Sequence, residues 1–500
     1  MRNRNLLISL IIFFSGALIM VYEIAGSRVL GPYLGTSVFV WTALIGIIMG
    51  SLSIGYWLGG KLSVKTDGLK GLAIILSLAA LFITITAIAN NYILIRLAKY
   101  VPLIRLRTIV ASIILFAPAS IFLGMVLPFS IRIIIEKIKN AGSRTGNLYA
   151  LSTTGSIAGT FAAGFFLLPD FGFLNVIFGI AILLLLLSSI LIWMIANKTL
   201  ILVPGFVLLT TGFFWFKAYS ESPGYIDTDT EYNRVLIYET TDKATGRPVK
   251  ILKVNDETSS AMFTDNDDGL AFEVLKYYHL VRHFVPGFEH CLMIGGSGYA
   301  FPKDYLKKYP DATLDVVEID PGLTALAKKH FNLPDDPDLN IIHADGRIFL
   351  NKNEQRYDAV FMDAYKSILT IPFQLTTKEA VQKIYNSLNE GGAVFANVIS
   401  ALEPAKSEFL VAELATYKSV FPQVLTFAVQ YPNPTPEQKS YFQNIMIVGI
   451  KSQMVPSFVS QDSVLNSFLA HKVGITIPEN TEILTDEYAP VEFLSGKNLK

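Results

Sequence analysis

Cysteine and charged residues are scarce in this chain of 500 residues. The single cysteine, Cys291, excludes an internal disulfide framework and a zinc site built from cysteines. Only 16% of the residues are charged, whereas 52% are hydrophobic and the mean hydropathy is +0.45. This composition excludes a disordered chain, a fibrous repeat and an ordinary cytosolic domain. It indicates that a membrane part and a soluble part are joined in one chain.

Acidic residues are almost missing from the first 217 residues. This stretch has 16 Lys and Arg against four acids, a net charge of +12. The remainder has 41 − 16 = 25 basic and 41 − 4 = 37 acidic residues, a net charge of −12. The formal charge of zero is therefore a cancellation between two different parts. The negative charge of the second part, and its lack of a basic, aromatic-rich stripe, argue against nucleic acid as a partner.

Long apolar runs fill residues 1–217, and we expect a multi-span helical domain in the lipid bilayer. A helix needs about 20 apolar residues to cross the hydrocarbon core. Seven runs qualify, at about 6–26, 37–60, 71–89, 109–135, 148–168, 173–196 and 199–217. The apolar stretch 90–108 carries four basic residues, so we expect it to lie at the membrane surface. Gly155, Gly159 and Ala163 recur at four-residue spacing, which lets another helix approach closely.

One acid near the end of the first run has two interpretations. Glu23 is followed five residues later by Arg28. A charge inside a span is costly, so it usually pairs with another charge or lines a polar cavity. The first interpretation is an ion pair between these two residues at the membrane interface. The second is a polar site for a cationic or amphiphilic substrate.

The second part of the chain has two successive patterns of predicted secondary structure. Residues 218–266 have β-branched runs separated by turns, which predicts a small β-rich subdomain. From residue 290 onward, short apolar runs alternate with helical segments, as in buried parallel strands joined by helices. We therefore expect a doubly wound, Rossmann-like α/β domain over 267–500, with ligands at the carboxyl ends of its strands.

Glycines and acids follow four successive predicted strands. A turn of Gly295-Gly296-Ser297-Gly298 follows the first, and glycines there let a ligand approach the backbone closely. Glu318 ends the second strand, where a carboxylate can accept both hydroxyls of a ribose. Asp345 ends the third, where it can accept from an adenine amino group, and Asp363 ends the fourth. Each acid alone could be a helix cap or a solvated turn, but together they predict a nucleoside site. We assign to it Gly295, Gly296, Gly298, Glu318, Asp345 and Gly346.

Residues 225–495 resemble the polyamine aminopropyltransferases, the spermidine synthase group. The resemblance rests on the motifs IGGSGY, VEID, HADGR and MDAY, and on the helix after IPFQLTTKEA. It implies the class I S-adenosylmethionine-dependent transferase fold, a Rossmann-like domain of the methyltransferase type. The segments YEIAGSRVLGPYLGTS, NDETSSAM and LTDEYAPVEFL are similar to a bacterial and archaeal subgroup in which such a domain follows a multi-span region.

The resemblance implies a co-substrate, an acceptor and a base. The co-substrate is decarboxylated S-adenosylmethionine or S-adenosylmethionine itself, the acceptor is a small amine, and no metal takes part. Asp363 is expected to take the proton of the attacking amine, because amines are protonated at neutral pH. Around the acceptor we expect Tyr232, Asn233, Glu273, Tyr365, Lys366 and Asp486. Aminopropyltransferases are commonly oligomeric, so the resemblance also implies a homo-oligomer.

Two departures from the family leave the reaction open. Gly298 and Lys366 stand where aminopropyltransferases usually carry an acid. Fewer carboxylates weaken a site for a diamine and no longer repel the carboxylate of intact S-adenosylmethionine. One alternative is therefore a methyl- or aminocarboxypropyl-transferase that uses S-adenosylmethionine on a substrate delivered by the membrane. Another is a polyamine or nucleoside sensor or transporter without catalysis, which would have no need of Asp363.

The two sides of the membrane differ little in positive charge. With seven spans, the side of the amino terminus holds nine Lys and Arg and the opposite side holds six. This bias favours a cytoplasmic amino terminus, which would place the soluble part outside. The co-substrate implied by the resemblance favours the cytoplasm instead. We expect an integral, multi-pass protein of the cell (inner) membrane with a cytoplasmic soluble domain, against this charge bias.

Overall fold

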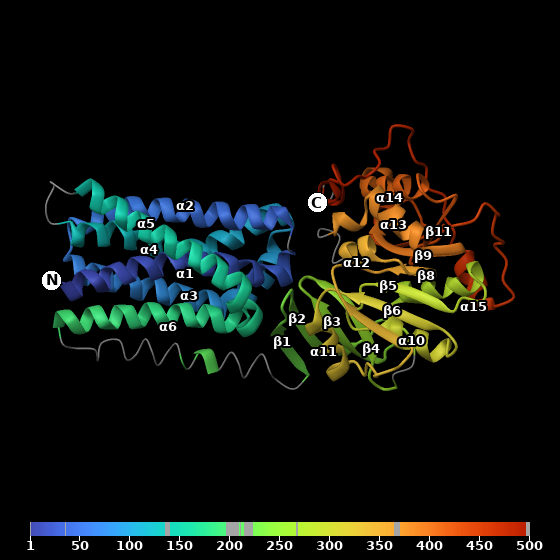
Figure 1. Cartoon of the computed structure of the whole chain (residues 1–500), viewed down its shortest axis with the longest axis horizontal. Coiled ribbons are helices and arrows are strands. Elements are labelled where there is room, and N and C mark those ends of the chain that lie inside the picture. The colour runs from blue at the N-terminus through green and yellow to red at the C-terminus, as the bar shows by residue number, and fades with distance from the viewer. Residues whose placement is uncertain are drawn as a thin grey trace. The chain divides into compact units, whose positions relative to one another are not determined.

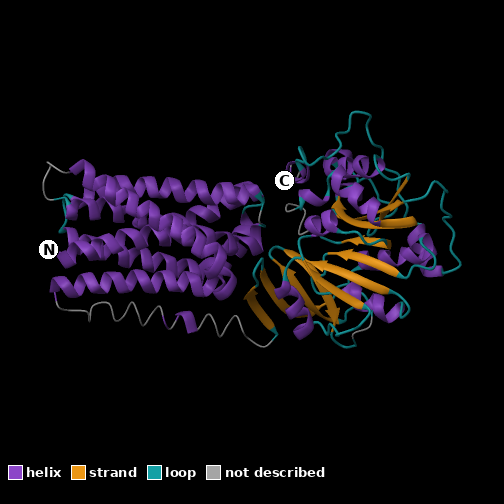
Figure 2. Cartoon of the chain, in the orientation of Figure 1, coloured by secondary structure: helices purple, strands orange, loops and turns teal. Residues whose placement is uncertain are grey.

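The computed structural model describes residues 2–35, 37–135, 141–196, 210, 212–214, 224–266, 269–364 and 371–496. The chain divides into two compact units, residues 1–235 and residues 236–499. Helices make up most of the first unit, whereas strands and helices alternate in the second (Figures 1 and 2). The boundary predicted at residue 217 lies outside the described residues.

The first unit is built from long apolar helices. They are α1 (Arg2–Leu34), α2 (Val38–Ser63), α3 (Gly68–Tyr100), α4 (Ile104–Ile134), α5 (Ala141–Ala162), the π-helical turn η2 (Ala163–Leu167) and α6 (Leu168–Ala196). Five helical segments are long and apolar enough to cross a membrane, and the last, Gly142–Ile195, has 54 residues. At 1.5 Å per residue that segment would reach about 80 Å, far more than a bilayer core of about 30 Å. Gly172 breaks it with a φ of 72°.

The seven predicted spans are matched only in part. The helices α1 to α6 cover six of the predicted runs, and five apolar segments result because α5, η2 and α6 are continuous in the described chain. Most of the predicted run 199–217 lies outside the described residues. The stretch 90–108 is divided between α3, which continues to Tyr100, and α4, which begins at Ile104, and its place at the membrane surface stays a prediction. Its apolar residues lengthen two helices instead of forming a separate one.

Small residues allow α5 to lie against α1. A Cβ atom built on Gly155 would lie 2.1 Å from the carbonyl oxygen of Phe13, and one on Gly159 would lie 2.3 Å from that of Ala17. No side chain fits at such distances, so these two positions require glycine for backbone contact. The close approach predicted from the four-residue spacing is confirmed.

A short segment after the helices packs against them within the first unit. Strand β1 (Tyr225–Asp229) and the first residues of β2 (Arg234–Thr241) form it. Arg28 of α1 donates to the carbonyl oxygen of Glu231 at 2.6 Å. This contact joins α1 to the segment, and the ion pair between Arg28 and Glu23 stays a prediction.

The second unit contains the predicted α/β domain. Most of β2, with β3 (Pro248–Val254) and β4 (Glu257–Phe263), belongs to it, and the four-stranded sheet has the order β1-β2-β3-β4. A seven-stranded sheet has the order β10-β11-β9-β8-β5-β6-β7. Its strands are β5 (His290–Ile294), β6 (Thr313–Glu318), β7 (Leu339–His343), β8 (Tyr357–Met362), β9 (Leu388–Ser400), β10 (Gln423–Ala428) and β11 (Gln443–Ile450). β5 to β9 pair in parallel, whereas β11 pairs antiparallel with both β9 and β10.

Helices precede, separate and follow these strands. They are α8 (Glu273–Lys276), α9 (Val281–Phe284), α10 (Ala300–Lys308), α11 (Pro321–His330), α12 (Gly346–Lys352), α13 (Lys378–Ser387), α14 (Glu408–Lys418), α15 (Ser463–Leu469) and α16 (Val491–Gly496). Side chains alternate between two buried clusters, with Met293 and Phe361 in one and Leu292 and Val360 in the other. This alternation shows that apolar groups cover both faces of the sheet.

Strand order places the switch point between β5 and β8. The chain runs outward from β5 to β6 and β7, then returns to β8 on the other side of β5. In open parallel sheets, ligands bind beyond the carboxyl ends of the strands at such a point. Gly295 follows β5 and Asp363 follows β8, so the predicted motifs lie at this edge.

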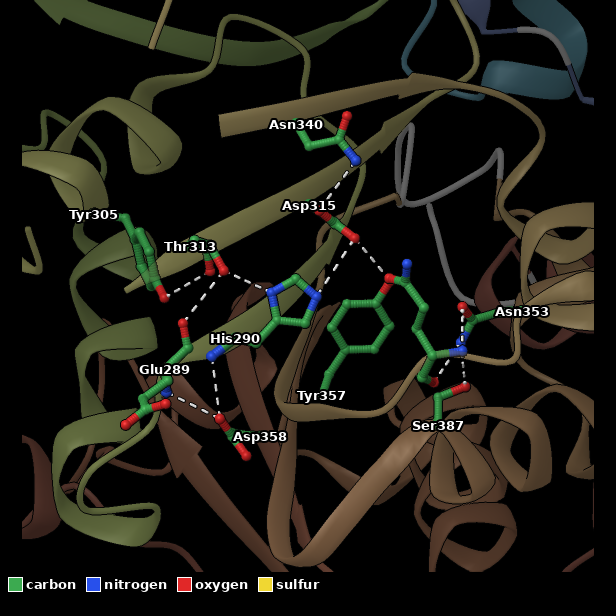
Figure 3. Close-up of polar contacts among 11 residues, drawn as sticks. Glu289, His290, Tyr305, Thr313, Asp315, Asn340, Asn353, Tyr357, Asp358 and Ser387 are labelled. Carbon is green, nitrogen blue, oxygen red and sulfur yellow. Dashed lines mark hydrogen bonds and ion pairs between the residues drawn. The ribbon is translucent and has the colours of Figure 1, made fainter. Parts of the chain in front are cut away.

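Polar side chains bond to one another at the amino ends of the strands, opposite the switch point (Figure 3). Asp315, 5% exposed, accepts hydrogen bonds from the Tyr357 hydroxyl at 2.9 Å and from Asn340 Nδ2 at 3.2 Å. The His290 ring stacks on the Tyr357 ring with centroids 4.8 Å apart, and its Nε2 lies 3.7 Å from Asp315. These contacts join four strands near their amino ends. We interpret this cluster as structural.

Candidate active site

The glycine turn after β5 is held by contacts within the protein. Gly295 has a φ of +97°, and a Cβ atom there would lie 2.5 Å from the carbonyl oxygen of Asp363. A Cβ on Gly296 would meet the Tyr299 ring at 2.6 Å, and one on Gly298 would meet Ser260 Oγ at 2.5 Å. Each position therefore needs glycine for packing, whether or not a ligand approaches.

Glu318 holds the same turn from the neighbouring strand. Its Oε2 accepts the backbone N–H groups of Gly296 and Ser297, each at 2.9 Å, and its Oε1 accepts that of Asp320 at 2.9 Å. Glu318 is only 5% exposed. A carboxylate has about four acceptor sites, so these three bonds leave one acceptor site on Oε1.

Asp345 begins α12 and caps it. Its Oδ1 accepts the N–H groups of Arg347 at 2.9 Å and Ile348 at 3.0 Å. The helix-cap interpretation of this acid is therefore correct, and the cap leaves Oδ2 unused. A Cβ on Gly346 would lie 2.8 Å from a methyl carbon of Ile294, so α12 packs tightly against the end of β5.

Asp363 follows β8 and lies next to the glycine turn. Its backbone N–H donates to the carbonyl oxygen of Ile294 at 2.9 Å, which fixes its place beside β5. Asn397 Nδ2 donates to its Oδ1 at 3.1 Å. Burial raises the pKa of the Asp363 carboxyl, and hydrogen bonds from Asn397 and Tyr278 offset this rise only in part. A carboxylate with a raised pKa is a better proton acceptor near neutral pH.

Two of the acceptor residues predicted from the sequence, Asp486 and Glu273, have contacts in the second unit. Asp486 forms an ion pair with Arg347 at 2.6 Å and accepts from Thr377 Oγ1 at 2.7 Å, which holds the carboxyl-terminal segment beside α12. Glu273 begins α8 and pairs with Lys276 at 2.6 Å on the surface. Neither contact marks an acceptor site.

Of the other four predicted acceptor residues, two belong to the first unit and two lie outside the described residues. Tyr232 and Asn233 belong to the first unit, where Tyr232 is 44% exposed and Asn233 is buried. The carbonyl oxygen of Asn233 accepts the backbone N–H of Thr230 at 2.8 Å, and the Asn233 N–H donates to Thr230 Oγ1 at 3.0 Å. Tyr365 and Lys366 lie outside the described residues.

Sequence reasoning missed the neutral amides beside Asp363. Asn397 interrupts the apolar run GGAVFANVIS, and Asn444 precedes the apolar run of β11. A polar residue near the end of a buried strand is a signal that could have found them. Among the described residues, no group of three His, Cys, Asp or Glu side chains could hold a metal ion.

Comparisons with known proteins find similar sequences for part of the chain. The family model for the spermine/spermidine synthase domain matches residues 273–457. A polyamine aminopropyltransferase of Vibrio vulnificus is 30% identical over 149 residues, which cover 29% of this chain and 48% of that protein. A probable polyamine aminopropyl transferase of Bifidobacterium longum is 27% identical over 218 residues, or 41% and 48% of the two chains. This chain thus spans about half the length of these curated relatives.

Two solved structures are also similar to part of this chain. A probable spermidine synthase from Corynebacterium glutamicum has 21% identity and a TM-score of 0.43, and the match covers 53% of this chain and 97% of that chain. Spermidine synthase from Thermotoga maritima has 18% identity and a TM-score of 0.35, with coverage of 46% and 73%. The family resemblance stated from the sequence is confirmed by the domain match. Residues 273–457 thus match the family model for the spermine/spermidine synthase domain, in a chain that also carries helices apolar enough to span a membrane.

Proposed function

We propose that this protein transfers an aminopropyl group from decarboxylated S-adenosylmethionine to a small amine, and that its apolar helices anchor it in a membrane. One observation carries the proposal. Asp363, a partly buried carboxyl with a raised pKa, lies at the switch point of a spermine/spermidine synthase domain. Glu318 and Asp345 end the two strands beyond β5, where they would hold ribose and adenine.

In this reaction the protein has to align the amine with the sulfonium and accept the proton that the amine loses. The amine nitrogen forms a bond to the propyl carbon next to the sulfonium, the carbon–sulfur bond breaks, and its electron pair stays on sulfur. The leaving group is neutral methylthioadenosine. Asp363 would accept the proton that the amine loses, and the fixed turn after β5 would keep the sulfonium in line with the amine.

A second candidate function has specific support. A Cβ on Gly298 would meet Ser260 Oγ at 2.5 Å, so an acid at position 298 would displace Ser260. The site thus lacks room for the carboxylate that the family usually places there. This favours a transferase that uses intact S-adenosylmethionine, whose own carboxylate would meet no repulsion at that point.

Calorimetry distinguishes the two candidates. We expect the purified protein to bind decarboxylated S-adenosylmethionine at least tenfold more tightly than the intact form, a difference of about 1.4 kcal/mol. Asp363→Asn should leave this binding nearly unchanged, because its proposed role concerns the amine. Asp335→Asn, at a surface carboxyl with 88% exposure, is the matched control. Equal or tighter binding of the intact form would refute aminopropyl transfer and support the second candidate.

A further inference from the structure

Two neutral amides, Asn397 and Asn444, lie with Asp363 on the same face of the sheet as a cluster of buried apolar side chains. Phe361, Phe395 and Met446 lie in one buried cluster, on β8, β9 and β11. Asp363 comes two residues after Phe361, and Asn397 two residues after Phe395. Asn444 comes two residues before Met446. Since side chains alternate along a strand, all three polar groups point to the face of that cluster.

These polar groups form a continuous chain of hydrogen bonds. Asn397 Nδ2 donates to Asp363 Oδ1 at 3.1 Å, and Asn444 Nδ2 donates to Asn397 Oδ1 at 3.0 Å. Gln430 Nε2 donates to Asn444 Oδ1 at 2.9 Å. Gln430 is exposed, whereas Asn444, Asn397 and Asp363 are partly buried. The chain therefore leads from the surface to the carboxyl group.

A backbone N–H group sets the direction of every hydrogen bond in this chain of amides, because it cannot flip as a side-chain amide can. The backbone N–H of Asn444 donates to Gln430 Oε1 at 2.9 Å. This fixes Oε1 of the Gln430 amide on the N–H and leaves its Nε2 for Asn444 Oδ1. The Asn444 amide must then present Nδ2 to Asn397, and Asn397 must present Nδ2 to Asp363. The loop is held as well, because Gln443 Oε1 accepts the N–H groups of Gln430 and Tyr431 at 3.2 and 2.9 Å.

We propose that Asn397, Asn444 and Gln430 are positioning residues that keep a donor on Asp363 Oδ1 and so hold the carboxylate in place to take the proton of the amine. The Tyr278 hydroxyl, a titratable group that also bonds this carboxyl, is unchanged in every variant below. The inference rests on the proposed function, in which Asp363 is the base. A fixed donor favours the ionised carboxylate and so opposes the effect of burial. It also prevents the carboxylate from rotating, which keeps one oxygen in line with the acceptor.

Two variants break the direction of the chain without removing bulk. In Asn444→Asp, a carboxylate cannot donate to Asn397, so the Asn397 amide loses its fixed direction. In Gln430→Glu, at the exposed end, the side chain still accepts the Asn444 N–H but cannot donate to its side chain. Gln438→Glu is the control, because it adds the same charge to the same loop while Gln438 Oε1 still accepts the Thr435 N–H at 2.9 Å.

The first readout is the titration of Asp363 by difference infrared spectroscopy, with Asp363→Asn as the reference. We expect Asn444→Asp to raise the midpoint by about one pH unit, the order of one lost hydrogen bond to a charged group. Gln430→Glu should raise it in the same direction, and Gln438→Glu should not. An unchanged midpoint in both variants, or an equal shift in the control, would overturn the inference.

The second readout is the pH profile of transfer. The acidic limb should move to higher pH with the same two variants, while the affinity for the nucleoside stays constant. A merely structural role would lower the rate at every pH without moving the limb. If the wild-type protein transfers nothing to any amine, the proposed function fails, yet the infrared titration still decides whether the amides control Asp363.

Discussion

Single residues at the ends of the strands are fixed mainly by contacts within the protein. Gly295, Gly296 and Gly298 each face a group that a side chain would strike, and Glu318 is occupied by three backbone N–H groups. The turn is therefore formed in advance and need not be ordered by a ligand. Asp363 differs, because burial raises the pKa of its carboxyl and the hydrogen bonds from Asn397 and Tyr278 offset only part of this rise.

Gly298 gives a prediction at this scale. Gly298→Ala would place its Cβ 2.5 Å from Ser260 Oγ, and we expect a loss of about 1–3 kcal/mol in the free energy of unfolding. Ser260→Gly in the same chain should restore most of this loss, because it removes the group that is struck. Chemical denaturation of the two single variants and the double variant measures this coupling. If the losses of the two single variants simply add in the double variant, the contact with Ser260 is not the reason that position 298 requires glycine.

At the scale of elements, the β1–β2 segment is tied to the helices of the first unit by buried charges. Arg234, 1% exposed, pairs with Asp227 at 2.6 Å, and its guanidinium lies 4.2 Å from the centre of the Phe173 ring. Asp229 Oδ2 accepts the Phe173 N–H at 2.9 Å, just after the break at Gly172. A carboxylate from a strand thus caps the helix that restarts after the break.

The Arg234–Asp227 pair can be tested by removing one partner. Arg234→Met would leave Asp227 buried and unpaired, and we expect a loss of about 3–5 kcal/mol. Adding Asp227→Leu should recover most of it. The control is Lys70→Met in the exposed pair Lys70–Asp67, where the two side chains are 63% and 57% exposed and the loss should stay below about 1 kcal/mol. Thermal unfolding of the full chain in detergent is the measurement, and equal losses in Arg234→Met and Lys70→Met would contradict this account.

The elements of the second unit could be predicted better than their contacts. Short apolar runs between Cys291 and Ile399 predicted the parallel strands, because a strand buried on both faces needs an apolar residue at nearly every position. The amide chain from Asn397 to Gln430 could not be predicted, since it depends on the antiparallel pairing of β9 with β11. The helix ends near residue 100 were also missed, because four basic residues there suggested a surface segment.

At the scale of the whole molecule, two parts of opposite charge are joined, and this much could be read from the sequence. The helical part holds the +12 and the remainder the −12, which suits an amine substrate in the second unit. The side of the membrane could not be predicted, because nine basic residues against six is a weak bias. The number of spans also stays a prediction where it depends on 199–217.

A labelling experiment decides the side. Val455→Cys introduces a thiol at a position that is 77% exposed, whereas the native Cys291 is fully buried. We expect no labelling by a membrane-impermeant thiol reagent in intact cells, and labelling once the cells are permeabilised. The parent protein, with Cys291 alone, shows the background. Labelling in intact cells would refute a cytoplasmic soluble domain.

The central claim is aminopropyl transfer with Asp363 as the base, and the release of methylthioadenosine tests it most directly. The full-length protein should release this product from decarboxylated S-adenosylmethionine only when an amine is present. Asp363→Asn should lower that rate by about 10²–10⁴-fold. Release without an amine, or turnover of intact S-adenosylmethionine alone, or an Asp363→Asn variant as fast as the wild type, would contradict the account.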